Sequence, residues 1–97
     1  MKFWRRDTKP RPEVERPDLV AWAAAVDASR LSDHTVRQAE EYVRDYRKLN
    51  VYTRRAISFR LVAQIEQQVS PPPPLSLLPN DIIWAALSAR RRQLGIG

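Results

Sequence analysis

The stretch PPPPLSLLP, residues 71–79, decides the fold. Proline fixes φ at about −65° and has no backbone N–H, so neither a helix nor an interior strand continues through four prolines in a row. Sequence typical of helices stands on both sides of this break. The break therefore predicts a body of helices before residue 71 and a separate C-terminal helix that begins near residue 80.

Two helices are expected in the first half of that body. Pro17 and Asp18 open the first one, because proline suits the first turn and an acid complements the positive end of the helix dipole. We expect this helix to reach about Leu31. Ser32 is then the expected N-cap of a second helix that ends near Asn50, its C-cap. The apolar stripe of the second helix is Val36, Ala39, Val43 and Tyr46.

A third and a fourth helix follow. Thr53 is the expected cap of the third helix, which runs to about Val69. Its stripe is Ile57, Leu61, Ile65 and Val69, widened by Phe59 and Val62. After the prolines, Leu75, Leu77 and Leu78 are too apolar for a free linker, so we expect them to cover the body. The last helix carries apolar residues on more than one side, namely Ile82, Ile83, Trp84, Ala86, Leu87 and Leu94.

Composition supports an all-α protein. The 97 residues are 43% apolar and 29% charged, which argues for one folded domain with a modest core. Only two glycines are present, fewer than strand-and-turn folds need. We therefore predict a small bundle of about four helices, the last set off by the proline break. The expected parts are an extended basic arm (1–16), a three-helix body (17–70), a connector (71–79) and a C-terminal helix (80–97).

The chain has few residues of the types that catalysis needs. The chain has no cysteine and a single histidine, His34, in the first turn of a surface helix. It lacks a glycine-rich phosphate loop and the ligand spacing of zinc sites. We therefore expect no enzymatic activity, no catalytic, metal or cofactor site, and no small-molecule substrate. The longest apolar run, residues 20–26, is far shorter than the roughly 20 residues of a membrane span. With no export signal in view, the expected location is the cytoplasm.

The C-terminal helix is the first candidate binding site. Its excess apolar surface predicts a face for a protein partner or for a second copy of the chain, within an oligomer or a larger assembly. We expect Ile83, Trp84 and Leu87 to form this face, with Arg90, Arg91 and Arg92 at its rim. Tryptophan and arginine are also the residues enriched where binding energy concentrates. The alternative is that the core absorbs the apolar residues.

The start of the third helix is the second candidate site. The net charge of +6 favours anionic partners, although a solvated basic surface explains it equally well. Arg54, Arg55 and Ser58 could face nucleic acid if the second and third helices formed a helix-turn-helix. Against this, the turn has no glycine, and salt bridges from the arginines to acids of the second helix are the preferred explanation. A third alternative, weaker than both, is membrane-surface attachment through Phe3 and Trp4.

Overall fold

A computed structural model describes residues 17–95 of the chain. Within that range the chain forms α1 (Pro17–Ala25), α2 (Asp33–Asp45), the 3-10 helix η3 (Tyr46–Lys48), α3 (Val51–Gln68) and α4 (Pro79–Leu94). The described residues contain no strand, only an isolated antiparallel bridge between Asp27 and Ser70. The predicted all-α bundle of four helices is confirmed. The predicted basic arm, with Phe3 and Trp4, lies outside the described residues.

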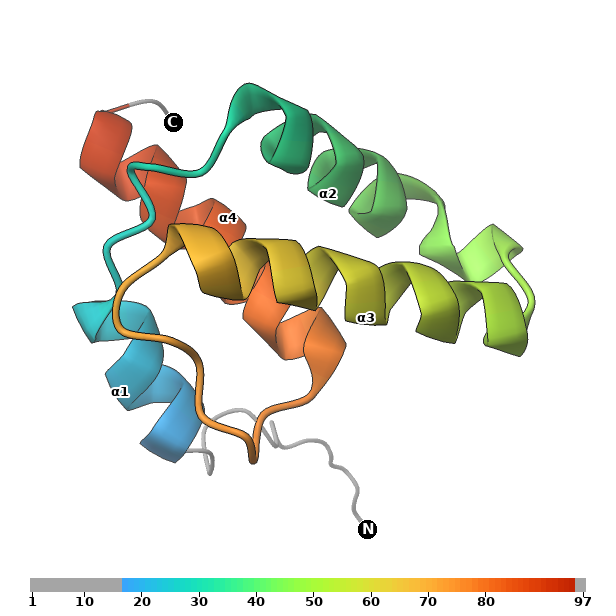
Figure 1. Ribbon diagram of the computed structural model, residues 1–97, viewed down its shortest axis with the longest axis horizontal. Helices are drawn as coiled ribbons and strands as arrows, with labels where there is room; N and C mark the ends of the chain where they lie inside the picture. Colours follow the sequence, from blue (N-terminus) through green and yellow to red (C-terminus); the bar gives the residue numbers. More distant parts are fainter. Residues whose placement is uncertain (1–16, 96–97) are drawn as a thin grey trace, which may run out of the picture.

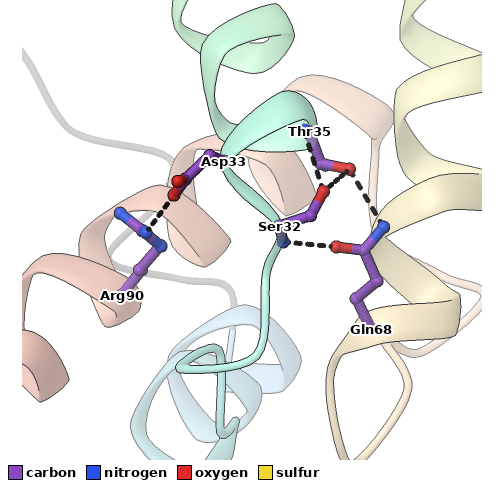
Figure 2. A network of polar contacts seen from close by, with 5 residues as sticks. All are labelled: Ser32, Asp33, Thr35, Gln68 and Arg90. Atoms are coloured by element: carbon purple, nitrogen blue, oxygen red, sulfur yellow. Dashed lines mark hydrogen bonds and ion pairs between the residues drawn. The ribbon is translucent and has the colours of Figure 1, made fainter.

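Helices α2 and α3 form an antiparallel hairpin (Figure 1). The start of α2 is fixed to the end of α3 by Gln68, whose Oε1 accepts from Ser32 N at 2.7 Å and whose Nε2 donates to Thr35 Oγ1 at 2.9 Å (Figure 2). The predicted N-cap is confirmed, since Ser32 Oγ accepts from Thr35 N at 3.1 Å. At the other end, the Tyr46 ring lies 5.6 Å from the Arg54 guanidinium.

The turn between α2 and α3 differs from the prediction. Helix α2 ends at Asp45 and tightens into η3, so it does not reach Asn50. Asn50 is the N-cap of α3, because its Oδ1 accepts from Thr53 N at 2.9 Å. The assignment of Asn50 as a C-cap and of Thr53 as the next cap was therefore wrong by one short turn. An asparagine suits both positions, so its residue type alone does not choose between them.

Helix α1 is shorter than predicted, ending at Ala25 instead of near Leu31. The following residues form a loop that the rest of the chain binds through its backbone. Asp27 N donates to Ser70 O at 2.7 Å, and Gln93 accepts from Ala28 N at 2.8 Å and donates to Val26 O at 2.6 Å. These long-range partners replace the intrahelical bonds that would have continued α1.

Helix α4 packs against each of the other three helices, and it runs from the middle of the molecule to its upper left edge (Figure 1). The proline break separates α3 from α4 along the chain, yet α4 returns to its own body. Its buried residues are Ile82, Ile83, Ala86, Leu87 and Ala89. They join a core formed with Trp22, Val26, Ala28, Leu31, Val36, Ala39, Tyr42, Leu61, Ile65, Val69 and Leu77.

A hydrogen bond also joins α2 to the start of α4, since Tyr42 Oη donates to Asn80 Oδ1 at 2.7 Å. Burial raises the pKa of the Tyr42 hydroxyl.

The connector covers the body less than expected. Leu77 is buried, but Leu75 is 99% exposed and Leu78 is also mostly exposed. The prediction that all three leucines cover the bundle was therefore wrong for two of them. The connector is instead attached through its first proline, since Trp22 Nε1 donates to Pro71 O at 2.9 Å.

Candidate protein-binding groove

An open groove of about 860 Å³ lies between α1 and α4. Its lining is mostly apolar and consists of Leu19, Val20, Ala23, Ala24, Asp81, Trp84, Ala85, Ser88 and Arg92. Two large side chains stand at its surface, Val20 at 58% exposure and Trp84 at 51%. We call this surface the α1–α4 groove. An exposed tryptophan over apolar walls is a typical protein-docking feature.

Helix α1 contributes to the groove because it is apolar on every side. Between Pro17 and Ala25 its only charged residue is Asp18. Trp22 faces the core, so Val20 and Ala24 on another side remain exposed. A short helix of this kind cannot bury its whole circumference against one neighbour.

The two ends of the α1–α4 groove carry opposite charge. Helices α1 and α4 run in the same direction, because Asp18 accepts from Ser76 Oγ at 3.0 Å near one end and Arg92 Nη2 donates to Ala23 O at 3.0 Å near the other. Acidic Asp18 and Asp81 thus lie at the amino ends of the two helices. Arg92 lies at the carboxyl ends.

The predicted apolar face of α4 is not a single surface. Ile83 is fully buried and Leu87 nearly so, and both belong to the core of this chain. Trp84 alone of the three reaches the surface. The assignment of Ile83 and Leu87 to an exposed face was wrong because α4 contacts α1, α2 and α3, and these two residues are buried in the core that the four helices share.

The three predicted rim arginines separate in space. Arg90 donates to Asp33 Oδ1 at 3.3 Å, so it ties α4 to the start of α2, with only 16% of its side chain exposed (Figure 2). Arg91 is exposed and does not line the groove. Arg92 lines the groove, so it is the only one of the three at the predicted rim. Consecutive helical residues point in different directions, which explains the separation.

Two of the three residues predicted to bind nucleic acid, Arg54 and Ser58, are bound within the fold of the chain itself. Arg54 donates to Leu49 O at 3.1 Å and lies against the Tyr46 ring, so it closes the preceding turn. Ser58 is buried and donates to Arg55 O at 3.0 Å. Arg55 is exposed. The antiparallel packing of α2 and α3 also differs from the crossing of a helix-turn-helix. The salt bridges expected for these arginines are replaced, at Arg54, by a carbonyl and an aromatic ring.

A second, smaller apolar surface lies beside Arg54 and Arg55. Val51, Phe59 and Leu78, all more than half exposed, line a groove of about 340 Å³. Phe59 was expected to widen the buried stripe of α3, but at 57% exposure it does not. This surface lacks a half-exposed tryptophan and opposite charges at its two ends.

Sequence reasoning missed the α1 half of the groove. Leu19, Val20, Ala23 and Ala24 were not assigned to a binding surface. The signal was present in the composition of α1, since nine residues with one charge leave no polar face. Ala85 and Ser88 were missed because small residues carry no binding signal until the fold places them beside a tryptophan.

Other kinds of site find no support between residues 17 and 95. No group of three or more His, Asp or Glu residues there could hold a metal ion. None of the helices in that range combines the length and the apolar character needed to cross a membrane. Comparisons of the chain with protein-family models, with curated proteins and with solved structures find no match.

Proposed function

We propose that this chain is a non-enzymatic helical interaction protein of the cytoplasm that docks a protein partner in the α1–α4 groove. The observation that carries the proposal is the half-exposed Trp84, which lies beside the exposed Val20 over walls of alanine. Burying these side chains against a partner would supply affinity. Arg92 at one end of the groove would supply orientation and a faster on-rate.

Site-specific photo-crosslinking in cells tests this function. The full chain carries the photoreactive residue p-benzoylphenylalanine in place of Val20, which leaves Trp84 intact. The matched control carries it in place of Phe59, which is equally exposed on α3. We expect crosslinked protein from position 20 and not from position 59. The crosslink should disappear when Trp84→Ala is added.

Each outcome of the crosslinking experiment has a defined meaning. A product heavier than the 11.3 kDa chain that depends on Trp84 supports docking in the groove. Products from position 59 alone would move the binding surface to α3 and overturn the proposal. The absence of any intermolecular product from position 20 would overturn it as well.

The alternative function, binding of DNA or RNA, now depends on Arg55 among its three candidate residues. A fluorescence-anisotropy titration with labelled duplex DNA at several salt concentrations tests it. We expect no sub-micromolar binding. Tight binding that weakens steeply with salt and is lost in Arg55→Ala would replace the protein-docking proposal.

A further inference from the structure

We propose that the occupant of the α1–α4 groove is a second copy of this chain, in a twofold-symmetric dimer with antiparallel α4 helices. The inference rests on the proposed function of the groove and names its partner. In a twofold interface the same surface of each copy meets itself, so the surface must be complementary to its own rotated image. The α1–α4 groove has this property in its charges.

The charges are complementary under a twofold rotation. Asp81 and Arg92 both line the groove and are eleven positions apart on α4. Eleven residues make three helical turns, so the two side chains lie on one face about 16 Å apart. When two α4 helices pair in opposite directions, Asp81 of each copy faces Arg92 of the other. Parallel pairing would instead bring like charges together.

The existing bonds of Arg92 leave it able to pair across such an interface. Its Nη2 donates to Ala23 O, and a guanidinium carries five N–H donors in all. The bond to Ala23 also holds the side chain at the edge of the groove. An arginine whose position is already fixed loses less entropy when it meets a carboxylate.

The small residues at the centre of the groove suit such an interface as well. The midpoint between Asp81 and Arg92 lies between Ala85 and Ser88, so these small residues would meet at the twofold axis and let the helices approach closely. Trp84 and Val20, both more than half exposed, line the same groove, so their apolar surface would be buried against the other copy.

Charge reversal with complementation in trans tests this dimer. Asp81→Arg and Arg92→Asp each place like charges opposite one another in the homodimer. Mixing the two variants restores an opposite pair at both ends. The full chain and both variants are studied by sedimentation equilibrium at about 0.15 M salt, where charges further apart than about 8 Å are screened and the net charge of +6 opposes association less than at low salt.

We expect the wild type to dimerise and each reversal to weaken the dimer by about tenfold or more. The equimolar mixture should recover the wild-type dissociation constant, with native mass spectrometry showing the heterodimer. The matched control is Arg91→Asp, since Arg91 adjoins Arg92 and lies outside the groove. Its groove charges are intact, so alone it should dimerise like the wild type, whereas its heterodimer with Asp81→Arg keeps one like-charge contact and should form more weakly than the wild-type dimer. Thermal melts by circular dichroism confirm that each variant is folded.

Three results would overturn the dimer. They are a wild type that stays monomeric up to several hundred micromolar, a dimer that both reversals leave unchanged, and a mixture without recovery. The crosslinking from position 20 separates these failures from failure of the groove itself. A Trp84-dependent product with a different protein, or one with residues 1–16 of the same chain, would name another occupant. If position 20 gave no crosslinked product, both the docking function of the groove and the dimer would be overturned.

Discussion

On the α2–α3 side of the molecule, polar side chains close the hairpin at both ends, with Gln68 at one end and Arg54 at the other. On the α1–α4 side, Arg92 makes a single bond to a backbone carbonyl, and Val20 and Trp84 stand half exposed over alanines. Both sides contain arginines and apolar helices, the two features that predicted binding sites. Only the second side combines a half-exposed tryptophan with opposite charges at the two ends of a groove.

The comparison shows that a residue's neighbours decide whether it is available for binding. Arg54 and Arg92 have similar surroundings in the sequence, each within a run of arginines on a helix. The first stacks on a ring of its own hairpin, and the second lines a groove. Availability therefore depends on contacts between segments far apart in the chain.

The largest expected difference in stability is between alanine substitutions of two adjacent residues of α4, Ile83 and Trp84. Ile83→Ala should lower the free energy of unfolding by about 2–5 kcal/mol, because it leaves a cavity in the core. Trp84→Ala, at a half-exposed position, should cost about 1 kcal/mol but abolish the crosslink from position 20. Urea denaturation at concentrations where the wild type is monomeric measures both.

Two results of these stability measurements would contradict the expected difference between Ile83 and Trp84. If Trp84→Ala destabilised the monomer as much as Ile83→Ala, the tryptophan would belong to the core and the groove would lose its main binding residue. If Ile83→Ala cost little, α4 would not be the central helix of the bundle.

Gln68 and Gln93 both hydrogen-bond segments that are distant in the chain, and their contributions to the free energy of unfolding should differ. Gln93 satisfies Ala28 N and Val26 O of buried residues, so Gln93→Ala should cost about 1–3 kcal/mol. Gln68→Ala should cost less, because water replaces the lost partner of Ser32 N at the surface and the buried Thr35 Oγ1 keeps its hydrogen bond from Ser32 Oγ. Urea denaturation and amide exchange at Ala28 provide the measurements.

A conservative variant controls for the loss of side-chain volume. Gln93→Met keeps most of the volume and loses both the acceptor for Ala28 N and the donor to Val26 O, so its cost should be close to that of Gln93→Ala if the hydrogen bonds carry the stabilisation. Equal costs for Gln68→Ala and Gln93→Ala would contradict the assigned difference between the two sides.

The sequence predicted the elements well because their signals are local. Ser32 as a cap, Pro17 as a first-turn residue and the end of α3 just before the prolines all follow from neighbouring residues. The end of α1 was missed because it is set by Ser70 and Gln93, residues 43 and 66 positions after Asp27. No local pattern contains that information.

The candidate site was predicted only in part. Trp84 and Arg92 were named, and the groove contains both. Ile83 and Leu87 were misassigned because a helix that is apolar on several sides can be central or exposed, and the sequence alone does not distinguish these. The α1 half of the groove depends on which side of α1 meets α4, a property of the packing.

Alanine substitutions of the neighbouring arginines Arg54 and Arg55 on α3 should show a smaller difference in stability. Arg54→Ala removes a bond to Leu49 O and a contact with the Tyr46 ring, so it should cost about 1 kcal/mol. Arg55→Ala, at an exposed position, should stay within about 0.5 kcal/mol of wild type. Urea denaturation of the two variants compares them directly. Similar costs would show that Arg54 is not bound within the hairpin.

The smallest expected effect is a pH dependence at Asp27, in the loop between α1 and α2. Hydrogen bonds from the hydroxyl and the backbone N–H of Ser29, at 2.7 and 3.0 Å, lower the pKa of this carboxyl below 3.8, and the charge of Arg30 lowers it further. A lowered pKa in the folded state means that the carboxylate stabilises the fold above pH 3.8, and that this stabilisation is lost as the pH falls through the folded-state pKa.

Asp27→Asn should therefore reduce stability slightly near neutral pH, and its difference from wild type should shrink as the pH falls below about 3.8. Asp45→Asn is the counterpart on the α2–α3 side, where the hydrogen bond from Arg44 lowers the pKa of Asp45. Urea midpoints between pH 2.5 and 6, in steps of about half a unit, measure both differences. A difference for Asp27→Asn that stays constant over this range would show that the Ser29 bonds do not favour the ionised carboxyl, and the loop that replaces the end of α1 would then be held by Ser70 and Gln93 alone.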